Sequence, residues 1–553
     1  LVSTDSNMPD CPENNFATLN LLEVSSTNDA VLSNGNLIMT PANGSGWNTR
    51  HSTAYMSSGK WYVEYSRVVN IGDVFGGIIQ EGATDANYVG YGANGYGYHV
   101  TGVVQKNASN VATGLATYGT DDVIGIALDM DNGTVQWSKN GTFQGSALTG
   151  LTGAWGFAVS FTVTGTTLGL NFGQDSSFAG NITSGSAGAS DDNGIGDFFN
   201  APPSGFLALC SSNLPELTIG PDQTTQADDH FNTVLYTGNG SSRSITGVGF
   251  SPDWIWFKAR SGAIAHLLYD SVRGATKYLQ ANSTSAEGTE SNSQTSFDSD
   301  GFSLGTDSTT GVNQNSTTYV AWNWLAGTAF SNDASATGVG DTDSEGQVNT
   351  KAGFAIIKWT SGGSSVVAHG LGKKPDLIII KSRDGTENWL VGNSATGFAN
   401  RTKLNTNDAQ GSSSAFSGGV TTTTFTEHIA NSSYDKIGYL FANTEGYCKV
   451  GTYEGNANND GTFVYTGFRP AFLLVKSVDS TSDWLLVDDK RIGYNPENEY
   501  IEVNNANAEG TVNMYDLVSN GFKNRDRTAD PNVAETYLYI AFASQPFKFA
   551  NAR

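Results

Sequence analysis

Acidic side chains are the residues of this sequence that most readily suggest chemistry. The chain of 553 residues has 53 Asp and Glu, and it contains close pairs such as Asp488 with Asp489 and Glu497 with Glu499. Two carboxylates that face each other across a cleft can hydrolyse a glycosidic bond, one of them acting as the general acid. With so many acids, such pairs arise from composition alone. These pairs therefore do not by themselves predict an enzyme.

Other patterns that support catalysis or metal binding are missing from the sequence. The six histidines never fall at the spacing of metal ligands, and there is no Gly-x-Ser-x-Gly elbow, phosphate-binding glycine loop or nucleophilic Cys/His pair. The run from Asp129 to Gly133 could be a calcium loop, but it lacks the spacing and the distal glutamate of an EF-hand. A hairpin turn is the better interpretation of that run. We expect no catalysis, no cofactor and no metal site.

The charge balance of the chain limits its partners. The net charge is −24, and no run of Lys and Arg occurs that could displace counterions from nucleic acid. No apolar run approaches the length of about 18 residues that a membrane helix needs. Cys11, Cys210 and Cys448 are too scattered for a disulfide scaffold or a zinc site, so we expect free thiols, with a Cys11–Cys210 pair as the alternative. We expect no nucleic-acid partner and no membrane insertion.

A short segment recurs three times in the C-terminal two-thirds of the chain. It reads Gly-x-x-Pro, then an apolar core, then Lys, and it occurs at 249–260, 372–383 and 467–478. A proline fits at the start of a strand because the first residue of a strand can lack a ladder donor. Each copy is therefore expected to contain a strand that begins near its proline.

Aromatic residues keep nearly the same distance from these prolines in each copy. The upstream residues are Tyr236, Trp359 and Tyr453, and the downstream residues, each 14 positions beyond its proline, are His266, Trp389 and Trp484. Equal spacing between strands requires equal strand and turn lengths, so one fold is predicted for all three copies. The repeats are far longer than solenoid units, so each is expected to have its own core. The downstream rings are predicted to be structural core residues.

A lysine recurs at the end of the repeated strand. Lys258, Lys381 and Lys476 each lie six residues beyond the marker proline. Because they recur in copies whose loops differ, we predict a role in the fold, either capping a strand end or pairing with an acid.

Composition predicts the fold class and the domain boundaries. Abundant glycine and short apolar runs between turn residues favour an all-β chain. We expect a first β-sandwich at 1–214 and three β-sandwich repeats at 228–330, 352–447 and 448–553, with linkers at 215–227 and 331–351. The second linker has no apolar period and is predicted to be irregular. The last two repeats have no spacer and are expected to pack as a rigid pair.

The first domain carries the pattern of a known family. Residues 57–66 alternate as a sandwich strand, with Trp61, Val63 and Tyr65 on one face. In order and spacing, the segments 59–64, 123–129, 137–141 and 171–173 resemble the SPRY domain over about residues 10 to 210. The resemblance implies a bent sandwich of two antiparallel sheets whose loops bind a partner, and it does not imply catalysis.

The amino-acid sequence of this domain also resembles SPRY modules of bacteriophage virion proteins, especially those of marine phages. The resemblance lies in the opening 14–20 and the close at 201–205, and the repeats resemble the β-domains that follow SPRY in such proteins. It implies a tail fibre, spike or capsid-surface protein on the virion. Its partners would be other virion proteins, copies of itself, as a trimer if it is a fibre, and a host surface polysaccharide or protein receptor.

Two other functions stay open at this point. A depolymerase of surface polysaccharide, either a hydrolase or a lyase, would need a carboxylate pair across a cleft lined with aromatic residues. An adaptor of the eukaryotic ubiquitin-ligase kind would need a RING-type Cys/His cluster or a coiled coil, and neither pattern is present in the sequence.

Sugar binding would use exposed aromatic rings on loops. The glycine-rich loop at 90–98 provides Tyr91, Tyr96 and Tyr98 as candidate ligand-binding residues. The alternative for these three rings is packing within the loop, which we favour.

Overall fold

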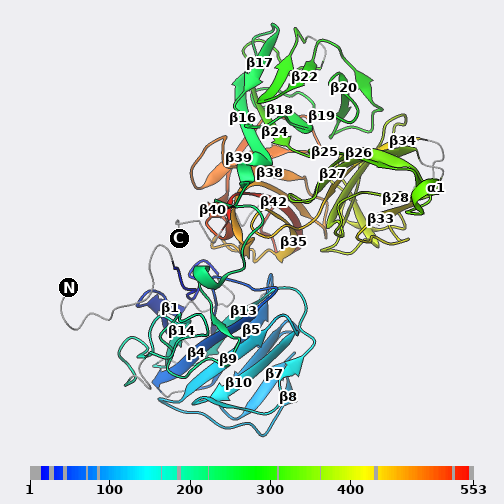
Figure 1. The fold of residues 1–553 in the computed structure, drawn as a ribbon. Coiled ribbons are helices and arrows are strands. Elements are labelled where there is room, and N and C mark those ends of the chain that lie inside the picture. The colour runs from blue at the N-terminus through cyan, green and yellow to red at the C-terminus, as the bar shows by residue number, and fades with distance from the viewer. Residues whose placement is uncertain are drawn as a thin grey trace. The chain divides into compact units, whose positions relative to one another are not determined.

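The computed structural model shows an almost entirely β protein, with 47% strand and 2% helix (Figure 1). It describes residues 14–23, 30–41, 46–69, 72–83, 87–162, 165–183, 188–221, 223–307, 310–360, 363–428, 434–525 and 530–546. The chain forms two compact units, the first made of 1–216 with 462–467 and the second of 217–461 with 468–553. The all-β prediction is confirmed.

The first unit is a sandwich of two antiparallel sheets. One sheet has the order β1-β2-β14-β4-β9-β10-β11, formed by Ala30–Ser33, Ile38–Pro41, Thr167–Asn171, Lys60–Val69, Val123–Asp129, Thr134–Lys139 and Thr142–Phe143. At its margins β12 (Leu148–Thr149) pairs with β10, and β15 (Leu207–Ala208) runs parallel to β4. The other sheet has the order β3-β13-β5-β6-β7-β8, formed by Asn48–His51, Trp155–Phe161, Val74–Gln80, Gly95–His99, Val103–Lys106 and Ser109–Ala112.

Local sequence signals explain the strands and turns of this sandwich. Trp61, Val63 and Tyr65 alternate along β4 and enter the main core, as predicted. The hairpin between β9 and β10 turns at Gly133, whose φ is +62°, and the Asp129 carboxylate accepts hydrogen bonds from the Asn132 backbone and side chain at 3.0 and 2.8 Å. Asp129 is therefore used in the turn, as the sequence predicted.

The second unit contains the three repeats, and their main sheets have the same strand order. The first is β16-β24-β18-β19-β20-β21, formed by Phe231–Thr237, Thr318–Trp324, Trp254–Ala259, Leu267–Asp270, Lys277–Gln280 and Gly288–Thr289. The second runs β27-β34-β29-β30-β31-β32, formed by Phe354–Thr360, Asp435–Phe441, Leu377–Ser382, Leu390–Asn393, Asn400–Lys403 and Gly411–Ser412. The third begins β35-β42-β37-β38-β39-β40, formed by Cys448–Glu454, Thr536–Pro546, Phe468–Ser477, Leu485–Asp488, Glu497–Glu502 and Gly510–Val518.

Smaller strands complete each repeat. In the first repeat β17 (Arg243–Thr246), β23 (Gly301–Leu304) and β22 (Gln294–Asp298) form a three-stranded sheet. In the second repeat β28 (Ser364–Ala368) pairs with β33 (Thr424–His428). In the third repeat β41 (Gly521–Asn524) pairs with the end of β40.

Residue registers show that the copies share one fold. Trp254 pairs with Trp324, Leu377 with Phe441, and Phe472 with Phe542. These three pairs occupy one position of the repeat, as the equal spacing predicted. The prolines themselves do not begin the strands: Pro252 and Pro375 lie two residues before β18 and β29, and Pro470 lies inside β37 at a bulge. A bulge tolerates proline because the ladder is interrupted there.

The predicted irregular linker at 331–351 is wrong. β25 (Thr328–Asn332) and β26 (Ser344–Asn349) form a hairpin that adds two strands to the edge of β27, with α1 (Ala334–Thr337) between them. Asp333 caps the short helix, and Gly338 ends it in the left-handed conformation. The segment lacks an apolar period because the hairpin lies at a sheet edge. Among the described residues, neither the first nor the third repeat has this addition in its main sheet.

Candidate functional site

The three candidate tyrosines differ in exposure. Tyr98 is fully buried and packs against Tyr118, and its hydroxyl donates to the carbonyl of Ala116. Tyr96 is 7% exposed, and its hydroxyl accepts a hydrogen bond from the Lys106 amine at 2.8 Å. Tyr91, at 44% exposure, is the member of this set that presents its ring to solvent. The burial of Tyr96 and Tyr98 is the loop packing that the sequence favoured, and it leaves Tyr91 as the exposed ring of the three.

A buried glutamate, Glu64, holds the segment around Phe199 and Asn200 that follows the last long strand of the first sandwich. The Glu64 carboxylate accepts hydrogen bonds from the backbone of Phe199 at 2.7 Å and from the backbone and side chain of Asn200 at 2.8 and 3.0 Å. Burial raises the pKa of Glu64 to about 7. Because Trp61, Val63 and Tyr65 of β4 face the core, alternation places Glu64 on the opposite face of the strand. The segment around Phe199 and Asn200 covers that face.

The carboxylates of the pairs that could have hydrolysed a sugar are buried or paired with arginine. Asp488 is 1% exposed and lies 2.6 Å from Arg491, and Glu497 is also 1% exposed. Burial and the neighbouring Asp488 and Asp489 raise the pKa of Glu497 to about 8. Glu499, the more exposed member, contacts Arg260 at 2.8 Å. Among the described residues no cluster of His, Cys, Asp and Glu has the form of a metal site.

The three recurring lysines cap the end of the repeated strand. Lys258, Lys381 and Lys476 are fully buried, and each amine donates to the carbonyl of the next residue, at 2.7, 2.9 and 2.7 Å. Each also donates to the carbonyl four residues on, at 3.3, 3.1 and 3.4 Å. Burial lowers the pKa of all three amines to about 8. The predicted capping role is confirmed.

The recurring rings lie where one repeat meets the next. Trp389 of the second repeat donates its indole N–H to the carbonyl of Gln280 in the first at 2.8 Å, and Trp484 of the third donates to Lys403 in the second at 2.9 Å. His266 of the first repeat contacts the carbonyl of Glu502 in the third through Nε2 at 3.0 Å. All three rings are buried, as predicted, and their contacts close a cycle of three equivalent junctions.

His266 can replace tryptophan because it is held neutral. Its Nδ1 accepts a hydrogen bond from the Trp256 indole at 2.9 Å, so Nε2 carries the proton that it donates to Glu502. Burial and the nearby Lys258 lower the pKa of His266 well below its usual value. The imidazole thus provides a buried donor like the tryptophans of the other copies.

A second set of contacts repeats the same cycle. The backbone N–H groups of Glu287, Gln410 and Glu509 donate to the carbonyls of Arg383, Val478 and Arg260, at 2.7, 2.9 and 2.9 Å. These bonds join the same pairs of repeats as the rings, but the donors run in the opposite direction, from the first repeat to the second, the second to the third and the third to the first. The prediction that the second and third repeats pack together is therefore only part of the arrangement, because the first repeat closes on both of them.

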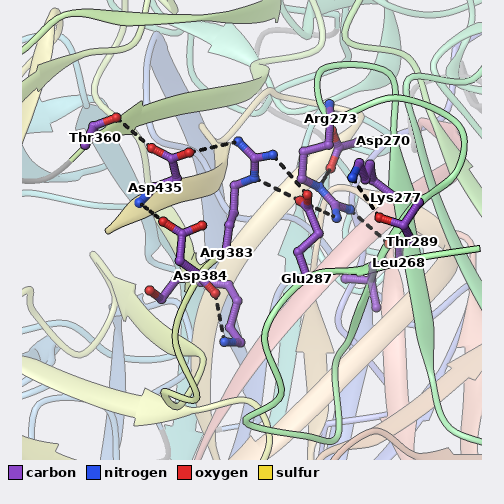
Figure 2. A network of polar contacts seen from close by, with 12 residues as sticks. Leu268, Asp270, Arg273, Lys277, Glu287, Thr289, Thr360, Arg383, Asp384 and Asp435 are labelled. Atoms are coloured by element: carbon purple, nitrogen blue, oxygen red, sulfur yellow. Dashed lines mark hydrogen bonds and ion pairs between the residues drawn. The ribbon is translucent and has the colours of Figure 1, made fainter. Parts of the chain in front are cut away.

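Two of the three junctions contain a charged network. At the junction of the first and second repeats, Arg273 lies 2.5 Å from Asp270, both fully buried, and Arg383 reaches Glu287 at 2.8 Å (Figure 2). The Tyr439 hydroxyl donates to Asp270 at 2.6 Å.

The junction of the third and first repeats repeats this network. Arg491 contacts Asp488 at 2.6 Å, Arg260 contacts Glu509 at 3.0 Å, and the Trp322 indole donates to Asp488 at 3.0 Å. Burial of such pairs is tolerated because each charge has a partner and further hydrogen bonds.

The third junction replaces the charges with neutral groups. The positions of Asp270, Arg273, Glu287 and Arg383 are occupied there by Asn393, Thr396, Gln410 and Val478. The Thr396 backbone donates to Asn393 at 2.8 Å, and the Gln410 amide donates to Thr396 at 2.8 Å. The geometry of the junction is thus kept without ions.

Sequence reasoning did not identify these junctions. The segment Ala-Glu-Gly-Thr occurs at 286–289 and again at 508–511, and the glutamate of each copy belongs to one of the two ionic junctions. One signal in the sequence could have revealed the cycle. The charged residues Asp270, Arg273 and Glu287 of the first copy are all replaced by neutral residues in the second copy. Charges that disappear together point to a shared contact.

The described cysteines and helices add no site. Cys210 and Cys448 are buried thiols, and burial raises the pKa of Cys210 to about 11. Cys11 lies outside the described residues. Within the described ranges, no helix has the length and apolar character to cross a membrane.

Comparisons with known proteins identify both units. A family model described as a SPRY domain matches residues 61–175, and one described as a domain of unknown function, DUF7483, matches residues 226–546. No match was found among curated proteins.

Solved structures that resemble part of the chain include three SPRY domains. The SPRY domain of human HERC1 is 20% identical, with 26% of this chain and 91% of that chain covered and a TM-score of 0.23. The TRIM65 PSpry domain is 15% identical, with 28% and 88% covered and a TM-score of 0.24. A further human SPRY domain is 16% identical, with 26% and 93% covered and a TM-score of 0.22.

Proposed function

We propose, from the premise that this chain belongs to the DUF7483 family and carries a SPRY domain, that it is a recognition and structural protein without turnover, borne on a bacteriophage particle. The SPRY sandwich binds a host surface receptor or a neighbouring virion protein. The three-repeat unit acts as the scaffold that holds this protein in the particle.

The observation that carries the proposal is the use made of the polar groups that recur among the repeats. The capping lysines bind carbonyls at strand ends, and the rings and the acid–arginine networks form the junctions between repeats. A catalytic centre would instead bring such groups to a cleft that a substrate can enter. The candidate carboxylates Asp488 and Glu497 are each only 1% exposed.

The virion assignment is supported by the resemblance of residues 14–20 and 201–205 to phage SPRY modules. Several copies on one particle would make successive contacts intramolecular, so that weak individual contacts suffice for attachment. The net charge of −24 does not prevent such assembly, since salt screens surface charges beyond about 8–10 Å. Gold-labelled antibody against the chain should decorate intact particles, and absence of label from particles that contain the chain would contradict an external position.

The function is tested by incubating the full chain with host envelope polysaccharide and measuring both retention and new reducing ends. We expect retention without cleavage. Tyr91→Ala should weaken retention about tenfold or more, because stacking on an exposed ring is lost. Tyr494→Ala, which removes another exposed ring at 66% exposure in the other unit, is the matched control and should bind normally. Release of reducing ends by the wild-type chain would show a depolymerase instead.

A further inference from the structure

Comparing the three similar repeats shows which structural features all of them share and which occur in one repeat. Features present in every copy, such as the capped strand ends and the junction rings, explain the common fold. A feature present in one copy is not needed for that fold, so it is a candidate for function. The hairpin β25–β26 with α1 is such a feature, because it extends the main sheet of the second repeat alone.

This hairpin forms one wall of an open cavity of about 360 Å³. The other wall is the end of β27 and the neighbouring strand ends, which bring Lys358, Arg383 and Asp435 to the same space. A cavity of this size falls within the range that small ligands occupy, which begins at about 300 Å³.

The lining is hydrophilic and has both donors and acceptors. Glu345 and Lys358 form an ion pair at 2.9 Å across β26 and β27, and their side chains are 61% and 32% exposed. Asp435, at 48% exposure, accepts from Thr360 at 2.7 Å and faces Arg383 at 3.9 Å. Figure 2 shows Arg383 between Asp435 on one side and Glu287 on the other.

From this cavity we infer a saccharide-binding site that takes an uncharged, hydroxyl-rich ligand. Each sugar hydroxyl both donates and accepts, which matches neighbouring carboxylates and cationic N–H groups better than an apolar ligand would. Four carboxylates line the cavity, those of Asp333, Asp343, Glu345 and Asp435, against the two cations Lys358 and Arg383. This excess repels uronic and sialic acids. The inference goes beyond the proposed function, which places recognition on the SPRY sandwich.

Equivalent positions of the other repeats lack the lysine and the aspartate of the cavity, although Arg383 has Arg260 as its equivalent in the first repeat. Lys358 corresponds to Leu235 and Thr452, and Asp435 to Thr318 and Thr536. Leu235 is 40% exposed, because no added strand covers its edge. The lysine and the aspartate of the cavity therefore accompany the hairpin, and neither occurs at the equivalent positions of the other two repeats.

The test measures binding of the full chain to an array of neutral hexose oligosaccharides, with uronic-acid oligosaccharides and spermidine as further probes. We expect a neutral oligosaccharide to bind, and Glu345→Gln and Asp435→Asn each to weaken it at least about tenfold, the effect of one lost charged hydrogen bond. Both side chains are exposed enough for the variants to fold, which a thermal melt confirms. Asp408→Asn is the matched control, since Asp408 is 54% exposed and pairs with Lys403 at 2.7 Å.

Each other outcome would overturn the inference. Failure of every neutral oligosaccharide to bind, binding that both variants leave unchanged, or loss of binding in Asp408→Asn as well would each remove the site. If spermidine binds to the wild-type chain and Asp435→Asn abolishes that binding, the cavity is a cation site instead. Tyr91→Ala should leave this binding intact, so the result is separable from the test of the SPRY surface.

Discussion

At the residue scale, the capping lysines show how an ionisable group can serve the fold. Lys258, Lys381 and Lys476 are fully buried without a direct carboxylate partner within ion-pair distance among the described residues, and each amine instead satisfies two strand-end carbonyls. A buried carbonyl without a donor is costly, so the amine stabilises the turn that follows the strand. Its own desolvation is what lowers its pKa to about 8.

Removing one capping amine should destabilise the second unit. Lys381→Met leaves the carbonyls of Ser382 and Gly385 without this donor, and we expect a loss of about 1–3 kcal/mol in the free energy of unfolding. Lys403→Met, which removes an amine paired with an exposed carboxylate, should change stability by less than about 0.5 kcal/mol. Urea denaturation measures both, and equal effects would contradict the capping role.

The same lysine predicts a pH dependence. Its folded pKa of about 8 lies below the unfolded value of 10.5, so the folded state binds fewer protons between those two values. The pH-dependent part of the contribution of Lys381 to stability is therefore fully present above about pH 10.5 and is lost as the pH falls through about 8. The stability difference between wild type and Lys381→Met should grow from pH 7 to pH 9.5. A difference that shrinks over this range would contradict the assigned burial of the amine.

At the element scale, the junctions explain why the repeats form one unit. Each repeat contributes a ring and a strand-end carbonyl to one neighbour, and it receives the same contacts from the other. Two junctions add buried ions, and the third has a neutral set at the same positions. The chain therefore contains its own comparison of ionic and neutral versions of one contact.

Breaking an ionic junction should cost more than altering the neutral one. Arg273→Met leaves the fully buried Asp270 without its cationic partner, and we expect a loss of about 3–5 kcal/mol. Thr396→Val, at the equivalent position of the neutral junction, removes the hydroxyl that accepts from Gln410 and donates to Asn393, and the two lost hydrogen bonds should together cost about 1–3 kcal/mol. Denaturant midpoints at constant slope provide the comparison. A larger loss for Thr396→Val would show that the ions do not bear on the junction.

The sequence predicted elements better than it predicted their assembly. The marker strands, the buried rings and the turns at Gly133 could be predicted, because spacing and turn chemistry are local. The hairpin at 328–349 was missed because an edge strand has no buried face and hence no apolar alternation. The junctions were missed because Arg383 and Glu287 lie 96 positions apart, and nothing local to either residue specifies the other.

At the scale of the whole molecule, the three repeats of the second unit form a closed cycle within a single chain. A head-to-tail contact closes into a ring when its rotation allows, and three copies achieve this here without separate subunits. Closure gives the first and third repeats a contact although they are distant in sequence. Function can then be added to a single copy, as at the β25–β26 hairpin, without altering the other two.

Hydrogen exchange at the three equivalent backbone amides of Glu287, Gln410 and Glu509 tests this closure most directly. Each donates across one junction, so a closed cycle predicts that peptides covering the three amides are protected alike and lose protection together as denaturant is added. Rapid exchange at Glu509, with Glu287 and Gln410 still protected, would show that the first and third repeats do not meet and would contradict the account.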